Sequence, residues 1–263
     1  MQVIIRPTPE EATRVVARVV EKEIRAHPDT VLGLATGSTM ERLYEMLVRK
    51  HQKEHLDFSL VRTFNLDEYV GLKPDDKHSY HAYMHEHFFR HINIDRRNTH
   101  LLDGMAKDLA AECQRYEDLI VHCGGIKLQL LGIGNDGHIG FNEPLSALQS
   151  RTRDKSLAPA TLEQNARYFG QIAHMPHRAL TMGVGTILGC KRLYLLATGR
   201  AKAAIIAKAV EGPITSMISA SAIQLHPHCT VVVDREAGSA LAAGEYYEWI
   251  FDHEPEWAEF RAA

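Results

Sequence analysis

The most informative segment of the chain is Leu128-Gln-Leu-Leu-Gly-Ile-Gly-Asn-Asp-Gly-His-Ile-Gly-Phe-Asn-Glu-Pro144. It begins with a short apolar run and continues into a turn that holds four glycines. Such a run is typical of a buried strand, and glycines let the backbone turn tightly and approach a ligand closely. Polar side chains alternate with the glycines: Asn135, Asp136, His138, Asn142 and Glu143. We therefore expect this strand to deliver two carboxylates and an imidazole to a ligand site.

Outward from this segment, short apolar runs alternate with helical patterns along the chain, as is typical of a mostly parallel sheet covered by helices. The predicted strands are 31–35, 60–64, 127–131, 192–197 and 230–233; the predicted helices begin at residue 9 or cover 40–50, 79–91, 107–121 and 201–210. Residues 145–176 are polar with weak periodicity, and we interpret them as a lid. The sequence predicts one α/β domain over residues 1–263. Its sheet is doubly wound, Rossmann-like and mostly parallel, with helices on both faces.

Composition narrows the class of protein. The 263 residues are 45% hydrophobic and 24% charged, and the formal net charge of -3 argues against a nucleic-acid or membrane-binding surface. The four cysteines lack CxxC or metal-ligand spacing, so we expect reduced thiols. The N-terminus has no signal-peptide core, and no apolar run reaches the roughly 18 residues of a membrane span. We expect a soluble, cytoplasmic protein with a small-molecule partner.

Two segments have the features of an anion site. Thr36-Gly-Ser-Thr39 connects a predicted strand to a helix, where free N–H groups and the helix dipole attract anions. Thr198-Gly-Arg-Ala-Lys202 occupies a second such junction and adds a cation. The first segment has an alternative explanation as a Ser/Thr helix cap that needs no ligand. Two such junctions at the carboxyl edge of one sheet favour a phosphorylated ligand.

Carboxylates follow another predicted strand, in Asn65-Leu-Asp-Glu-Tyr69. Adjacent side chains on an extended chain point to opposite sides, so only one of Asp67 and Glu68 should face a ligand. A helix cap or a solvated acidic pair is the alternative. Together with Asp136, His138 and Glu143, this segment predicts a proton-transfer site near neutral pH.

Histidines are concentrated between residues 78 and 91. His81 and His85 have the i, i+4 spacing that can chelate a metal on a helix. There is no HExxH motif, and the neighbouring aromatic residues favour a half-buried amphipathic helix. We expect no metal there. The full set is His78, His81, His85, His87 and His91.

Taken together, these motifs resemble the glucosamine-6-phosphate deaminase (glucosamine-6-phosphate isomerase) family over nearly the whole chain. The resemblance rests on 31–39, 64–72, 132–144, 150–153, 179–186 and 225–227. It implies conversion of glucosamine 6-phosphate and water to fructose 6-phosphate and ammonia in amino-sugar catabolism, without a metal or organic cofactor. A 6-phosphogluconolactonase-like hydrolase and a non-catalytic sugar-phosphate sensor are the alternatives; the sensor predicts loss of Asp67 or His138, and both are present.

The resemblance also implies roles for individual residues. His138 opens the sugar ring, with Asp136 and Glu143 setting its charge and orientation, and Asp67 carries a proton from C2 to C1. The residues implied in binding the substrate and its phosphate are Thr36, Gly37, Ser38, Thr39, Gly132, Arg167 and Lys202.

Regulation differs among members of this family. Some are hexamers activated by N-acetylglucosamine 6-phosphate at a subunit interface, and others are unregulated monomers. Ser146, Arg153 and Lys155 resemble the positions of that effector site, whereas Ala147 replaces a hydroxyl residue and the C-terminal tail differs. The alternative for the two basic residues is a solvated loop.

Overall fold

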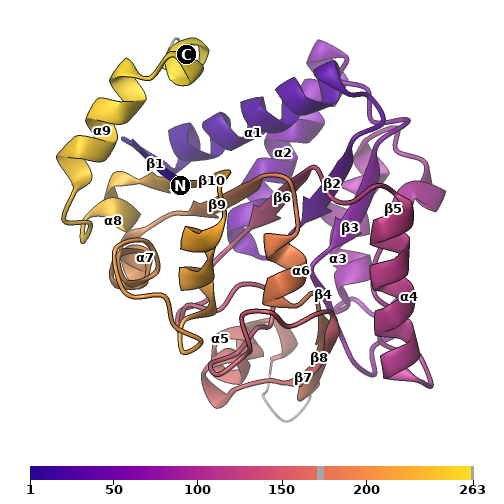
Figure 1. Cartoon of the computed structure of the whole chain (residues 1–263). Coiled ribbons are helices and arrows are strands. Elements are labelled where there is room, and N and C mark those ends of the chain that lie inside the picture. The colour runs from indigo at the N-terminus through magenta and orange to yellow at the C-terminus, as the bar shows by residue number, and fades with distance from the viewer. Residues whose placement is uncertain (171–174, 262–263) are drawn as a thin grey trace.

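The computed structural model describes residues 1–170 and 175–261, without the side chains of residues 167 and 168. Within that part, seven strands form one parallel sheet in the order β1-β10-β9-β6-β2-β3-β5 (Figure 1). Their bounds are β1 Gln2–Arg6, β2 Val31–Leu34, β3 Arg62–Asn65, β5 Thr99–His100, β6 Leu128–Leu131, β9 Leu193–Ala197 and β10 Cys229–Asp234. The central strands are buried on both faces, which explains their nearly continuous apolar sequences.

Helices cover both faces of this sheet, so the predicted doubly wound α/β class is confirmed. Figure 1 shows α1 beside α2, with α4 and α6 across the sheet. The α-helices are α1 Pro9–Ala26, α2 Ser38–Glu54, α3 Tyr80–His87, α4 Leu109–His122, α5 Pro159–Phe169, α6 Val184–Leu188, α7 Ala203–Val210, α8 Arg235–Gly238, α9 Gly244–His253 and α10 Ala258–Arg261. The 3-10 helices are Phe89–His91, Arg96–Asn98, Arg200–Lys202, Ser219–Leu225 and Pro255–Trp257.

Local sequence explains where α1 begins and which face it buries. The Thr8 hydroxyl accepts a hydrogen bond from the Glu11 N–H at 3.2 Å, and Pro9 occupies the first turn, where no N–H is needed. The buried side chains of α1 recur every three or four residues and face the sheet. The described residues contain no helix that is both long and apolar enough to cross a membrane.

Two of the predicted helices are shorter than expected. The helix predicted over 79–91 ends at His87 and is followed by a 3-10 turn, and the one predicted over 201–210 begins as a 3-10 turn. Phe88, which lies between α3 and the 3-10 turn Phe89–His91, has φ -141°, which is outside the helical region.

A three-stranded antiparallel sheet, which the sequence pattern did not reveal, lies at the carboxyl edge of the large one. It has the order β4-β8-β7, with β4 Asp67–Tyr69, β7 Arg153–Ser156 and β8 Arg178–Thr181. Leu66 joins the two sheets: its N–H donates to the Leu34 carbonyl at 3.1 Å, and its carbonyl accepts from the Met182 N–H at 2.7 Å. A single residue therefore separates the end of β3 from the start of β4.

The segment interpreted as a lid contains regular structure. Both β7 and α5 lie within residues 145–176. A small apolar cluster packs this region against β4 and β8; it consists of Tyr69, Phe141, Leu157, Phe169, Met175 and Ala179. Residues 171–174 lie outside the described part, and movement of the segment stays a prediction.

Candidate active site

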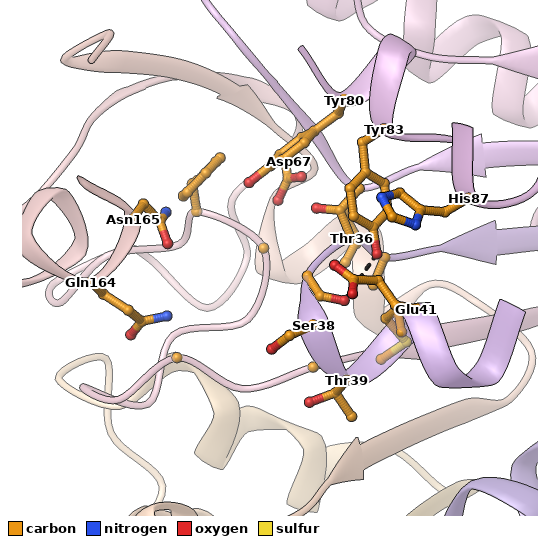
Figure 2. Close-up of a pocket in the computed structure, with 18 of the residues that line it drawn as sticks. Thr36, Ser38, Thr39, Glu41, Asp67, Tyr80, Tyr83, His87, Gln164 and Asn165 are labelled. Carbon is orange, nitrogen blue, oxygen red and sulfur yellow. Dashed lines mark hydrogen bonds between the residues drawn. The ribbon is translucent and has the colours of Figure 1, made fainter. Parts of the chain in front are cut away.

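A cavity of about 1150 Å³ opens where the carboxyl ends of the central parallel strands meet the small sheet. This edge is where open α/β sheets bind ligands. Its walls come from the loop before α2, the start of β4, α3, the turn after β6, α5 and the loop after β9. Figure 2 shows side chains of α5 facing those of the α2 loop and α3 across this space.

The loop before α2 presents an uncapped helix N-terminus to the cavity. Gly37 is the N-cap residue with φ 106°, a conformation that favours glycine, and no side chain makes a capping hydrogen bond. The alternative that the hydroxyls serve as helix caps is therefore wrong. Tyr83 donates to the Gly37 carbonyl at 2.9 Å and Tyr44 to the Ala35 carbonyl at 2.5 Å, so two tyrosine hydroxyls fix the backbone of this loop. Thr36, Gly37, Ser38 and Thr39 all line the cavity.

A cation lies at the second junction, after β9. The Lys202 ammonium donates to the Ile133 carbonyl at 2.8 Å and to Asn135 Oδ1 at 2.7 Å. These contacts hold it at the wall of the cavity, which Gly132 also lines. Arg167 belongs to α5, but its side chain lies outside the described part of the chain, so its predicted role is untested.

Of the two adjacent carboxylates, Asp67 lines the cavity and Glu68 does not. Asp67 is only 6% exposed. Burial, followed by the neighbouring Glu68 charge, raises the pKa of Asp67 to about 8. In the unliganded protein this carboxyl group is therefore largely protonated at neutral pH, unless a cation arrives beside it.

Glu68 points to the N-terminus of α3. Its carboxylate accepts hydrogen bonds from the N–H groups of Tyr69 at 2.8 Å and of Tyr80 and His81 at 3.0 Å each, and it contacts His81 Nδ1 at 2.8 Å. Two of these donors belong to the first turn of α3, where the helix dipole also favours a negative charge. Glu68 thus fixes α3 against β4.

Glu68→Gln is expected to lower the free energy of unfolding by ~2–4 kcal/mol, because the amide puts a donor among N–H donors and removes a buried charge from its partners. Thermal and urea unfolding measure this. Glu86→Gln, on the exposed side of α3 where Glu86 pairs with Arg90, is the control and should change stability by less than about 1 kcal/mol. Equal, small effects of both substitutions would contradict the structural role of Glu68.

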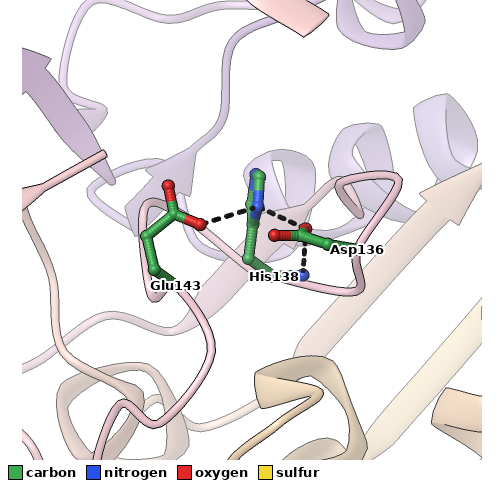
Figure 3. Close-up of side chains that lie close together, drawn as sticks. All are labelled: Asp136, His138 and Glu143. Atoms are coloured by element: carbon green, nitrogen blue, oxygen red, sulfur yellow. Dashed lines mark hydrogen bonds and ion pairs between the residues drawn. The ribbon is translucent and has the colours of Figure 1, made fainter. Parts of the chain in front are cut away.

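The turn after β6 gathers the imidazole and its two acids (Figure 3). His138 Nδ1 lies 2.6 Å from Asp136 Oδ1 and 3.7 Å from Glu143 Oε2. Burial alone would raise the pKa of Asp136, but the imidazole contact outweighs it and the pKa is lowered. Glu143 Oε1 also accepts from the Ala158 N–H at 3.0 Å, immediately before α5. Both acids face the same ring nitrogen, which leaves Nε2 for a ligand.

Glycine is required beneath the imidazole. A Cβ atom at Gly134 would lie 2.4–2.6 Å from three atoms of the His138 ring. The ring therefore packs directly on the backbone of Gly134, and its position depends on the conformation of that turn.

Asp136, His138 and Glu143 are also the one group among the described residues with three metal-ligating atoms within 4.8 Å of one another. The histidines of α3 form no such group there. His81 contacts Glu68, while His78 stacks on Phe169 with ring centroids 4.6 Å apart. An imidazole between two carboxylates is also an arrangement that can exchange protons near neutral pH.

The sequence did not single out several residues of the cavity wall. Tyr80, one of the aromatic residues beside the histidines that favoured a half-buried helix, lines the cavity, and its hydroxyl lies 3.5 Å from that of Tyr69. Asn165 donates to the Tyr69 hydroxyl at 3.2 Å, and Gln164 accepts from the Asn135 N–H at 3.1 Å. No motif marked these side chains, because α3 and α5 bring them to the site only through tertiary packing.

The three residues that resemble an effector site lie away from the cavity lining. Arg153 and Lys155 are two positions apart on β7 and so share a face of the strand. Arg153 Nη1 donates to Asn142 Oδ1 at 2.9 Å. Ser146 is buried, and its N–H donates to the Glu143 carbonyl at 3.0 Å. Arg153 and Ser146 therefore contact the segment that carries Glu143.

This fold and cavity define an α/β protein with an uncapped helix N-terminus beside an imidazole–carboxylate cluster. Residues 8–232 match the family of glucosamine-6-phosphate isomerases/6-phosphogluconolactonase, and the chain belongs to this family. The predicted family membership is therefore confirmed.

Similar proteins point to one branch of the family. Glucosamine-6-phosphate deaminase of Arthrobacter sp. (strain FB24) is 48% identical over 257 residues, covering 98% of this chain and 99% of that protein. Glucosamine-6-phosphate deaminase 1 of Bacillus subtilis (strain 168) is 48% identical over 239 residues, covering 91% and 99%. The solved structure of a monomeric glucosamine-6-phosphate deaminase is 48% identical, with a TM-score of 0.89 and coverage of 91% and 100%.

A more distant structure shares the fold. The 6-phosphogluconolactonase from Trypanosoma brucei is 19% identical with a TM-score of 0.70, covering 92% of this chain and 98% of that one. At this identity the likeness shows the fold alone.

Proposed function

We propose that this chain is a glucosamine-6-phosphate deaminase that converts glucosamine 6-phosphate and water to fructose 6-phosphate and ammonia. One observation supports the chemistry most directly. A buried carboxyl group, Asp67, and the His138 imidazole, which Asp136 contacts at Nδ1, line the same cavity as an uncapped helix N-terminus. Relatives named as this deaminase match nearly the full chain at 48% identity. The whole chain acts as one unit, because both sheets contribute to the cavity.

The substrate phosphate rests on the first turn of α2. The N–H groups at Ser38 and Thr39 and the hydroxyls of the loop donate to its oxygens, and Lys202 supplies a positive charge. Arg167 on α5 is the second cation of this proposal, brought in when the segment 145–176 closes over the substrate. A phosphate held at one end of the cavity fixes the position of C1 and C2 at the other.

Ring opening is the task of His138. Its Nε2 takes the proton of the C1 hydroxyl; the C1–O5 bond breaks as the C1 carbonyl forms, and the imidazolium gives this proton to the ring oxygen O5. Asp136 and Glu143 at Nδ1 orient the imidazole and stabilise the imidazolium that forms. The product of this step is the open-chain amino aldose.

Proton transfer between C1 and C2 is the task of Asp67. The protonated amine at C2 favours the ionised form of this carboxyl group, which otherwise has a raised pKa. Asp67 removes the C2 proton while a proton of the ammonium group passes to the C1 carbonyl oxygen, which gives an enolamine; Asp67 then returns its proton to C1, leaving a protonated imine at C2. Water adds to this imine and ammonia leaves, so that fructose 6-phosphate is formed.

The test is an assay of fructose 6-phosphate and ammonia from glucosamine 6-phosphate in the presence of a chelator. Equimolar products that survive chelation are expected, because the proposed steps use side chains alone. Absence of both products would overturn the proposal. Hydrolysis of 6-phosphogluconolactone by the same preparation would favour the lactonase alternative, and binding of sugar phosphate without turnover would favour the sensor.

We further propose that Ser146, Arg153 and Lys155 bind the phosphate of N-acetylglucosamine 6-phosphate, and that this effector acts only on a hexamer. Contacts of the first two with the segment carrying Glu143 support a link to catalysis. The solved relative at 48% identity is described as monomeric, and an unregulated enzyme is expected if this chain is monomeric too. Light scattering with and without the effector, together with activity measurements, tests whether activation occurs only when the chain forms a hexamer.

A cytoplasmic location is part of the same proposal. Its support is the phosphorylated substrate and the four free cysteines, which a reducing compartment preserves.

A further inference from the structure

Asn135 connects two parts of the cavity wall that are far apart in sequence. Its backbone N–H donates to Gln164 Oε1 on α5 at 3.1 Å. Its side-chain Oδ1 accepts from the Lys202 ammonium at 2.7 Å. The next residues of the chain, Asp136 and His138, are the proposed ring-opening group. The turn that carries this group is thus fixed by α5 on one side and by Lys202, the proposed cation for the substrate phosphate, on the other.

Gln164 is placed to act on this turn. It is half-buried, lines the cavity and points from α5 into it (Figure 2). Helix α5 touches the site at two further points: Asn165 donates to the Tyr69 hydroxyl, and the Ala158 N–H just before the helix donates to Glu143. These contacts limit the freedom of α5, so Gln164 meets the turn from a fixed support.

The turn transmits the orientation of one peptide group to the imidazole. Within it, the Gly134 N–H donates to the His138 carbonyl at 2.9 Å, and the Gly137 N–H donates to the Gly134 carbonyl at 3.1 Å. The imidazole packs directly on Gly134. A rotation of the peptide between Gly134 and Asn135 therefore shifts the ring and its contact with Asp136. Displacements near 1 Å are enough to slow a reaction by about 100-fold.

We propose that Gln164 is a positioning residue for ring opening, which acts through its Oε1 acceptor on the Asn135 N–H. This inference rests on the proposed function. It assigns no direct contact between Gln164 and the sugar. Filling of the cavity by substrate removes water from this hydrogen bond and strengthens it, so its effect is largest in the enzyme–substrate complex.

The test compares four proteins: wild type, Gln164→Met, Gln164→Glu and Glu163→Ala. Methionine keeps the length of the side chain without the acceptor, and we expect kcat for glucosamine 6-phosphate to fall about 10- to 50-fold. Glutamate keeps an acceptor oxygen, and kcat should recover to within about 3-fold of wild type. Glu163→Ala alters the neighbouring exposed residue of α5 and should leave kcat unchanged. Thermal unfolding of each protein checks that it is folded.

A second measurement separates positioning from direct binding. The open-chain alditol 2-amino-2-deoxyglucitol 6-phosphate needs no ring opening, so its inhibition constant should stay within about 2-fold of wild type in Gln164→Met. A parallel loss of kcat and of alditol affinity, without rescue by Gln164→Glu, would show that Gln164 donates to the sugar and would overturn the inference. Wild-type kcat in Gln164→Met would overturn it as well. An inactive wild-type protein would instead reject the proposed function, and the inference with it.

Discussion

Asp67→Asn is expected to lose turnover by a factor of about 10² to 10⁴ while still binding the substrate phosphate. Removal of a general base costs this much in enzymes, and here the same group serves both the C2 and the C1 proton transfers. The amide has nearly the same size, and the proposed phosphate ligands lie elsewhere in the cavity. Steady-state kinetics give kcat, and titration with the alditol phosphate gives the affinity. Wild-type turnover in this variant would refute the assignment of the base.

The same substitution is expected to stabilise the unliganded protein at alkaline pH. An unfolded Asp releases its proton near pH 3.8, whereas the folded carboxyl group keeps it until about pH 8. Between these values the unfolded state binds fewer protons, so stability falls as pH rises. Asn has no carboxyl proton to lose and so avoids this loss in the free energy of unfolding, which amounts to ~2–5 kcal/mol above pH 8. Unfolding measured at pH 5 and pH 9 should show a much larger gain for the variant at the higher pH.

His138→Gln is expected to slow the ring-closed substrate by a factor of about 10² or more, and an open-chain substrate far less. Glutamine can hydrogen-bond but cannot exchange a proton at neutral pH. A suitable open-chain substrate is the 2-amino-2,4,5-trideoxy analogue, which has no hydroxyl able to close a five- or six-membered ring. The measurement is the ratio of variant to wild-type kcat/KM for each compound.

The pattern of the two ratios decides the role of His138. Equal losses on both compounds would mean that His138 does not open the ring and acts in a later step. His122→Gln at the exposed end of α4 is the control and should leave both ratios near one. An Asp136→Asn variant is expected to follow the pattern of His138→Gln, because it removes the acid at Nδ1.

Five strands of the large sheet were predictable because burial on both faces demands apolar runs, as in 128–131 and 193–197, whereas the edge strands β1 and β5 were not predicted. The small sheet was not. The sequence of β7, Arg-Asp-Lys-Ser, alternates intermediate with exposed positions and carries no apolar signal, and β4 has only three residues. Pairing with β8 makes both into strands, and that contact is invisible to a local pattern.

The site was predictable to the extent that strand ends define it. Asp67 and the turn with Asp136 and His138 follow parallel strands, so their meeting at one edge follows from topology. Gln164 and Tyr80 lie on helices whose packing could not be derived from spacing. The cap explanation for the α2 loop was wrong because Gly37, rather than a hydroxyl residue, occupies the cap position.

Leu66 marks the boundary between the two sheets, and each sheet contributes a different part of the cavity. The large sheet supplies the helix end and the ammonium proposed to hold the phosphate, and the small sheet supplies the carboxyl group proposed to move protons at C1 and C2. The large sheet also carries the turn with His138, so it is the proton transfer between C1 and C2, and not the ring opening, that is separated from phosphate binding. An engineer who seeks a new reaction on a phosphorylated sugar can vary the three short strands and keep the phosphate anchor intact. The same separation gives evolution a way to change the reaction without first losing the substrate.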